Sequence, residues 1–213
     1  MSAPPGACAS ADVLRLLLFC SLCFAADRYA NVAALRADKK EGVDFRVETL
    51  DRSSPVTVLA IHGGKIEEGT SPVARRLAGE DWNLYLFEGL RSPARDLHVT
   101  ASHFDDPAAV ALASRSTFAV SVHEEREAGV NACIGGADAA LGRRVAEALR
   151  QAHFAAEQPC RRLRGRSPKN IVNRAGSGVQ LEMTKDLLDL LNGNAGEMAR
   201  FVKAVRAAIS TRR

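Results

Sequence analysis

Short apolar runs alternate along this chain with segments whose apolar residues recur at helical spacing. The runs typical of strands lie at residues 44–48, 56–61, 84–87, 117–122 and 178–182. Helices are predicted at residues 30–37, 73–78, 107–115, 137–152 and 198–209. Strands that alternate with helices predict an α/β sandwich with a largely parallel or mixed sheet.

Two local patterns refine this outline. Thr70 and Ser71 precede Pro72, which indicates a side-chain cap followed by a proline in the first turn of a helix. Residues 98–102 fit either a short strand or a loop.

The first 26 residues differ in character from the rest of the chain. Residues 13–26 read VLRLLLFCSLCFAA and resemble a short signal-peptide core, although Arg15 interrupts them. Cleavage there would make the protein secreted or periplasmic, whereas a non-native leader from an upstream start codon would leave it cytoplasmic. The apolar run is too short to span a membrane, so no stable membrane span is expected. We therefore predict a leader at residues 1–26 and a single domain at residues 27–213, since 213 residues can bury one substantial core.

Charge narrows the classes of partner. The net charge is +4, and the densest basic cluster is the segment 161–166, Arg-Arg-Leu-Arg-Gly-Arg. This segment is either a solvated loop or a surface that attracts an anionic substrate. Aromatic residues make up only 5% of the chain and none are interleaved with the basic cluster, so we expect no nucleic-acid partner.

The chain has five cysteines, at positions 8, 20, 23, 133 and 160. Cys20 and Cys23 form a Cys-x-x-Cys inside an apolar run without a second pair, which we interpret as coincidence. Cys133 and Cys160 can pair only if the fold brings them together.

Two predicted strands run directly into a histidine. Residues 56–61 lead into His62 and residues 117–122 into His123, and Glu67 follows His62 by five positions. Because sites in open α/β sheets form at the carboxyl ends of strands, these side chains are candidates for one site. His, Glu and His are the ligand set of one type of open catalytic zinc site. Gly63-Gly64 would let the turn carry Glu67 back toward His62, although a histidine at a strand end can equally be structural.

Hydrolysis at such a metal also needs a carboxylate that is not a ligand. Glu182 is the candidate, because its strand would point it to the face opposite Val179 and Leu181. Arg174 is the candidate substrate-binding cation. Each of the two could instead be an ordinary surface residue.

The chain resembles the poly-γ-glutamate hydrolase family, zinc-dependent enzymes of bacteria and their phages. The resemblance covers residues 29 to 182 through motifs that occur in family order. They are Tyr29-Ala30-Asn31, Glu41-Gly42-Val43-Asp44-Phe45, the segment from His62 to Ser71, Leu84-Tyr85-Leu86-Phe87-Glu88-Gly89, the segment from Leu97 to Pro107, Val120-Ser121-Val122-His123, Gly135-Gly136-Ala137-Asp138, Asn170-Ile171-Val172-Asn173-Arg174 and Gly178-Val179-Gln180-Leu181-Glu182.

The resemblance implies a fold like that of the zinc carboxypeptidases, an α/β three-layer αβα sandwich with an open mixed sheet, and a role for each candidate residue. It implies Zn²⁺ held by His62, Glu67 and His123. It implies Glu182 as general acid and base, and Arg174 as a cation that binds the substrate or polarises its carbonyl. Asn173 would orient a substrate carboxylate. His98 would lie near the site, as a substrate contact or behind a ligand, and a structural hydrogen-bonding role is the alternative. The implied substrate is a polyanionic γ-glutamyl chain, and we expect a monomer.

Departures from the family pattern keep the substrate open. Where the family usually has glycine after the third ligand, this chain has Glu124-Glu125-Arg126-Glu127. Acidic residues beside the metal would repel polyglutamate unless they turn outward. The alternatives are a zinc peptidase or amidase of the same fold, acting for example on peptidoglycan peptides, and a metal-binding protein without activity.

Overall fold

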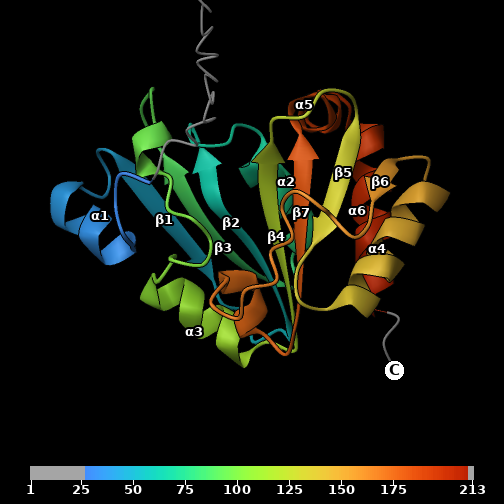
Figure 1. Ribbon diagram of the computed structural model, residues 1–213, viewed down its shortest axis with the longest axis horizontal. Coiled ribbons are helices and arrows are strands. Elements are labelled where there is room, and N and C mark those ends of the chain that lie inside the picture. The colour runs from blue at the N-terminus through green and yellow to red at the C-terminus, as the bar shows by residue number, and fades with distance from the viewer. Residues whose placement is uncertain (1–26, 211–213) are drawn as a thin grey trace, which may run out of the picture.

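A mixed seven-stranded sheet organises residues 27–210, the part of the chain that this computed structural model describes (Figure 1). Its strands are β1 (Phe45–Leu50), β2 (Val56–Gly64), β3 (Asn83–Gly89), β4 (Phe118–Glu125), β5 (Asn131–Gly135), β6 (Ala155–Glu157) and β7 (Ser177–Thr184), in the order β1-β3-β2-β4-β7-β5-β6. The central four, β3, β2, β4 and β7, run parallel. β1 pairs with β3 and β5 with β7 in the antiparallel sense, and β6 lies parallel to β5. The predicted leader lies outside the described residues.

Helices cover both faces of the sheet (Figure 1). They are α1 (Val32–Asp38), α2 (Thr70–Ala78), α3 (Pro107–Arg115), α4 (Ala139–Gln151), α5 (Lys185–Gly193) and α6 (Ala195–Ser210), with short 3₁₀ turns η1 (Arg95–Leu97) and η2 (Ile171–Arg174). Apolar side chains of α2, α4, α5 and α6 form one core with the sheet, and those of α1, α3, η1 and η2 form a second core on the other face. This arrangement confirms the predicted α/β sandwich with an open mixed sheet.

Strand alternation decides which polar side chains share a face. In β7, Val179 and Leu181 enter the first core, so Gln180 and Glu182 point to the opposite side. In β4, Val120 and Val122 enter the same core, which turns His123 to the side of Glu182. The expected orientation of Glu182 is therefore observed.

β2 departs from this alternation at its carboxyl end. Val58 and Ala60 pack into the first core, and strict alternation would send His62 there too. The pairing of β2 with β3 shifts register between Ala60 and Gly63, an irregularity of the kind that re-aims side chains beside active sites. His62 consequently lies beside His123.

The sequence pattern missed several short elements. β5 and β6 have five and three residues, and α5 follows β7 without a loop. Residues 98–102 form no strand. The predicted cap of α2 is wrong, because Gly69 occupies that position and the Thr70 hydroxyl donates to the Glu67 carbonyl at 2.8 Å.

A disulfide joins Cys133 to Cys160. It links β5 to the segment after β6, and the 27-residue separation explains why the sequence left this pair open. The other three cysteines lie outside the described residues.

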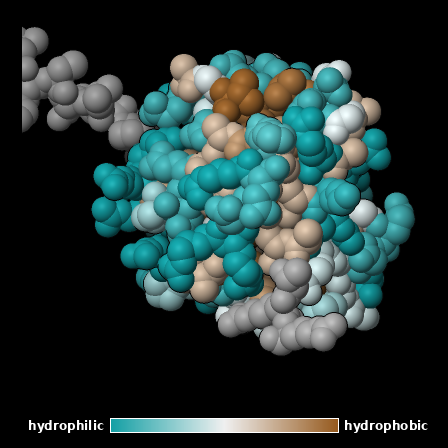
Figure 2. All heavy atoms as spheres, turned by 90° about the vertical axis from the view of Figure 1, so that its right-hand side faces the viewer, coloured by the Kyte–Doolittle hydropathy of each residue, from teal (hydrophilic) through white to brown (hydrophobic). Residues whose placement is uncertain are grey.

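The outer surface over α4 and α6 is mainly hydrophilic. Figure 2 shows this side of the molecule, on which strongly hydrophobic side chains gather at the upper rim. Between residues 27 and 210, no helix is long and apolar enough to cross a membrane.

Candidate metal centre

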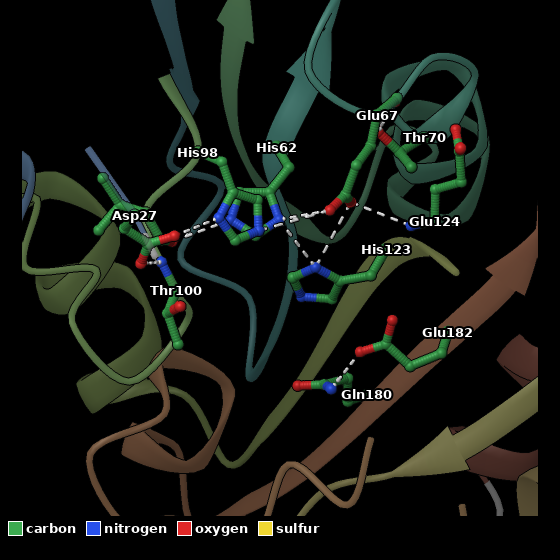
Figure 3. Close-up of polar contacts among 11 residues, drawn as sticks. Asp27, His62, Glu67, Thr70, His98, Thr100, His123, Glu124, Gln180 and Glu182 are labelled. Carbon is green, nitrogen blue, oxygen red and sulfur yellow. Dashed lines mark hydrogen bonds and ion pairs between the residues drawn. The ribbon is translucent and has the colours of Figure 1, made fainter. Parts of the chain in front are cut away.

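Three histidines and a glutamate converge where β2 and β4 end (Figure 3). The His62 Nδ1 lies 2.8 Å from the Glu67 Oε1 and 3.2 Å from the His123 Nδ1. The Glu67 Oε2 lies 3.6 Å from the same His123 nitrogen. The structure thus brings together the three residues that were predicted as metal ligands.

The turn after His62 depends on its glycines. Gly64 has a φ of 65°, and a Cβ there would overlap the carbonyl oxygen of Gly89. A Cβ on Gly63 would overlap the hydroxyl of Ser71. With both positions small, the chain doubles back until the Glu67 amide donates to the His62 carbonyl at 2.8 Å.

The hydrogen bonds of His62 determine its tautomer. Its Nε2 lies 2.9 Å from the Val99 carbonyl oxygen, which can only accept, so this nitrogen carries a hydrogen. In the neutral ring, the Nδ1 therefore has a lone pair, and it faces a Glu67 carboxylate oxygen. Two acceptors at 2.8 Å repel each other unless a cation or a proton lies between them. A backbone carbonyl behind one ring nitrogen is also the usual support of a metal-binding histidine.

His123 and Glu67 supply further features that favour a bound cation. The buried Nε2 of His123 has no hydrogen-bond partner among the described residues. Burial alone would raise the pKa of Glu67, but His62 and His123 hold it well below its usual range. Glu67 also accepts a hydrogen bond from the Glu124 amide at 3.0 Å. A fixed anion among imidazoles suits a divalent cation that binds nitrogen and oxygen, as zinc does.

His98 belongs to the same cluster. Its Nδ1 lies 2.7 Å from the Asp27 Oδ1, which must accept, so its Nε2 is left with a lone pair. That nitrogen is 3.9 Å from the Glu67 Oε1, and the His98 ring lies 4.0 Å from the ring of His62 between centroids. Ligand atoms of His62, Glu67 and His98 all lie within 4.8 Å of one another. His98 is therefore a candidate fourth ligand as well as a candidate substrate contact.

Asp27 was missed as a site residue. It accepts hydrogen bonds from His98 and from the Thr100 amide, at 2.7 Å and 2.6 Å. No local motif marks it, because the contact joins residues 71 positions apart.

Glu182 is the register partner of His123 across β4 and β7. Burial, together with the carboxylates of Glu67 and Glu125, raises the pKa of Glu182 to about 7 against the opposing effect of His123. Gln180 donates a hydrogen bond to its carboxylate (Figure 3). A buried carboxyl group that exchanges its proton near neutral pH fits general acid and base chemistry.

Arg174 and Asn173 make no recorded contact with this cluster. Arg174 is exposed at the end of η2 and has neither a hydrogen bond nor an ion pair with any residue in the described range. The Asn173 amide donates to the Gly165 and Ser167 carbonyls and its oxygen accepts from the Ala137 amide. Asn173 therefore holds neighbouring loops together, and its predicted substrate contact stays a prediction, as does that of Arg174.

The acidic run after His123 divides into two parts. Glu125 is buried and receives two hydrogen bonds of 2.7 Å from Arg162. Glu124 is partly buried, and its pKa is raised by burial and by the neighbouring Glu67, Asp189 and Glu68, against the effect of Lys185. The carboxylates of Glu68, Glu124 and Asp189, which we call the acidic rim, thus lie on the Glu67 side of the site.

Known proteins resemble this chain in both sequence and fold. A family profile described as poly-gamma-glutamate hydrolase matches residues 29–199. The UPF0714 protein YndL of Bacillus subtilis (strain 168) is 38% identical over 169 residues, which cover 76% of this chain and 65% of YndL. The SPbeta prophage-derived UPF0714 protein YoqZ of the same strain is 35% identical, with 75% of this chain and 58% of YoqZ covered. The chain thus spans somewhat less than two thirds of the length of these two curated relatives.

Two solved structures resemble this one closely. A bacteriophage poly-gamma-glutamate hydrolase gives a TM-score of 0.81 at 32% identity, with 86% of this chain and 97% of the other covered. A structure of YndL described as apo and zinc-free gives a TM-score of 0.80 at 33% identity, with 87% and 98% covered. Fold and sequence agree, and the chain belongs to the poly-gamma-glutamate hydrolase family.

Proposed function

We propose that this protein is a zinc-dependent hydrolase of γ-glutamyl amide bonds, acting on poly-γ-glutamate. The observation that carries the proposal is the lone pair of the His62 Nδ1, which faces the Glu67 carboxylate at 2.8 Å. Membership of the family supports the reaction class. A related structure described as zinc-free supports zinc as the metal.

His62, Glu67 and His123 would hold the zinc in this proposal. Zinc bound there would acidify a water molecule and polarise the scissile carbonyl. Glu182 takes a proton from the attacking water as its oxygen bonds to the carbonyl carbon. The same carboxyl group then returns that proton to the nitrogen as the carbon–nitrogen bond breaks. The products are a free carboxylate and a free amine.

The remaining residues orient the reactants. Asp27 and Val99 fix the rings of His98 and His62 through hydrogen bonds of 2.7 and 2.9 Å. Gln180 restrains the Glu182 carboxylate. The exposed Arg174 would bind a substrate carboxylate, since its guanidinium makes no ion pair with a described residue.

Metal content and hydrolysis, measured together, test the proposal. Wild-type protein purified without chelator should hold about one zinc per chain and release short oligomers from poly-γ-glutamate. His62→Ala should lose both the metal and the activity. Glu182→Gln should keep the metal and lose the activity, whereas the exposed control Glu80→Gln should keep both. No zinc in the wild type, or full activity in Glu182→Gln, would refute the mechanism.

A second substrate class is favoured by one observation, the carboxylate of Glu124 beside Glu67, which has no ion pair with a described residue. A neutral or shorter amide, such as a peptidoglycan peptide, would meet less repulsion there. Cleavage of muropeptides by a protein that leaves poly-γ-glutamate intact would favour this alternative. Zinc binding without hydrolysis of either substrate would indicate a metal-binding protein.

A further inference from the structure

A cationic cavity lies beside the candidate active site. It has a volume of about 440 Å³ and lies between the start of α4 and residues 158–166. Its size is within the range of small-ligand pockets. Three arginines are among the residues that line it, Arg161, Arg164 and Arg166. We call residues 160–166 the arginine loop.

The cavity carries uncompensated positive charge. Among the described residues, Arg161, Arg164 and Arg166 form no side-chain ion pair with a carboxylate, although Arg161 helps to lower the pKa of the neighbouring Glu157. The fourth arginine of the loop, Arg162, is different, because it is bound to Glu125 and Glu157 at 2.7 Å.

The carboxylate that lines the cavity, that of Asp138, is already engaged. It caps α4 by accepting from the Ala140 and Leu141 amides at 2.9 Å, and it accepts a hydrogen bond from Ser177. The lining thus has three arginines without an ion pair and one carboxylate that is already engaged, and this excess of positive charge favours an anionic ligand.

The arginine loop is held in place from several sides. The disulfide to Cys133 and a 2.9 Å hydrogen bond from the Cys160 amide to the Ile134 carbonyl attach its start to β5. The Gly136 amide donates to the Arg164 carbonyl at 2.9 Å. This anchoring lowers the entropic cost of ordering the loop around a ligand.

The same loop touches the residue that holds the proposed acid and base. Gly165 packs so closely on Gln180 that a Cβ would lie 2.9 Å from the Gln180 Oε1. Gln180 in turn donates to Glu182. Figure 1 shows this segment, in orange, crossing in front of β7 on its way to η2. The cavity and Glu182 thus lie on either side of a single loop.

The charge around the site differs between its two sides, with carboxylates near Glu67 and arginines beyond Gln180. On the Glu67 side, Glu124 has no ion pair with a described residue, while Glu68 and Asp189 are paired with Lys65 and Lys185. The three arginines of the cavity lie beyond Gln180 on the β5 side. A polyanion that reaches the metal centre is repelled on the first side and attracted on the second. Its chain should therefore extend over β7 toward the arginine loop.

We propose that the arginine cavity is a substrate subsite that binds α-carboxylates of a γ-glutamyl chain on one side of the scissile bond. The inference rests on the proposed function for its substrate class. In a γ-linked chain, the side-chain carboxyl forms the amide, so each residue keeps a free α-carboxylate. Guanidinium groups bind carboxylates through paired hydrogen bonds, and several together distinguish a polymer from a short amide.

Binding to an inactive protein tests the subsite separately from catalysis. In a Glu182→Gln background, calorimetric titration with a γ-linked glutamate pentamer should show binding that weakens about tenfold on Arg164→Gln or Arg166→Gln. The matched control is Arg76→Gln, which removes an exposed arginine on α2 that does not line the cavity. It should change the affinity by less than about twofold.

Linkage chemistry and kinetics separate a specific subsite from general attraction. An α-linked glutamate pentamer of equal charge should bind at least about tenfold more weakly than the γ-linked one. In the active enzyme, the arginine variants should raise KM for long polymers and leave kcat on a γ-glutamyl dipeptide unchanged. Equal affinities in the arginine variants and the control, or equal binding of both linkages, would overturn the subsite while leaving hydrolysis intact. A wild type that cleaves no γ-glutamyl bond would refute the proposed function instead, and the binding comparison would still stand or fall by itself.

Discussion

Replacing Glu182 by glutamine should stabilise the metal-stripped protein at alkaline pH while it abolishes hydrolysis. Glu182 is only 5% exposed, and burial together with the carboxylates of Glu67 and Glu125 raises its pKa to about 7. His123 opposes this rise only in part. Glutamine keeps the shape of the side chain and remains neutral, so it can still accept the hydrogen bond from Gln180.

The sign and size of the effect follow from the two pKa values. Between pH 4.5 and about 7, the folded protein holds a proton on Glu182 that the unfolded chain has released. Stability therefore falls as pH rises through this window and stays lowered above it. The rise from 4.5 to about 7 corresponds to about 3 kcal/mol, at about 1.4 kcal/mol per pH unit.

Urea unfolding after EDTA treatment measures this contribution. Glu182→Gln and wild type should have the same free energy of unfolding at pH 4.5 and differ by about 3 kcal/mol at pH 8, with the variant more stable. The exposed control Glu80→Gln should show no such pH-dependent gain. A difference that is equally large at both pH values, or no gain at pH 8, would refute the reasoning, because neither result is consistent with a buried carboxylate that ionises at cost.

Three further tests concern the metal centre and the arginine loop. His123→Ala should lose zinc, whereas His98→Ala should retain it with about 10- to 100-fold weaker affinity, and elemental analysis showing the reverse would make His98 the ligand. Gly64→Ala should lower the free energy of unfolding by about 2 kcal/mol or more and release zinc, since the φ of 65° and the Gly89 carbonyl exclude a side chain. The control Gly193→Ala, which has open space around the new methyl group, should keep the metal. Reduction of the disulfide removes the covalent anchor of the arginine loop to β5. It should raise KM for long poly-γ-glutamate at least about threefold and leave cleavage of a γ-glutamyl dipeptide unchanged. An unchanged KM would show that the remaining contacts are enough to hold the loop in place.

Local patterns were sufficient to predict the two strand ends that carry the candidate ligands. Six-residue apolar runs before His62 and His123 identify buried strands, and parallel strands end at the same edge of a sheet. The position of Glu67 also followed from local chemistry, because two glycines permit the reversal that brings it back to His62.

The parts that could not be predicted depend on long-range pairing. β5 is a strand through its pairing with β7 and β6, and the Cys133–Cys160 disulfide joins it to the segment after β6. Asp27 meets His98 across 71 positions. The register shift before Gly63 is a feature of the pairing between β2 and β3, so the apolar pattern of β2 alone did not show that His62 leaves its expected face.

The pKa values of Glu67 and Glu182 shift in opposite directions. Burial alone would raise the pKa of both side chains. Glu67 contacts His62 and His123, which together outweigh burial and keep it anionic, as a metal ligand must be. Glu182 has Gln180 as a neutral donor and carboxylates as neighbours, so burial prevails and its proton becomes exchangeable near pH 7. Two carboxyl groups whose environments push their pKa values apart are suited to different roles. Residue type cannot distinguish these roles, but the neighbours that the fold supplies do.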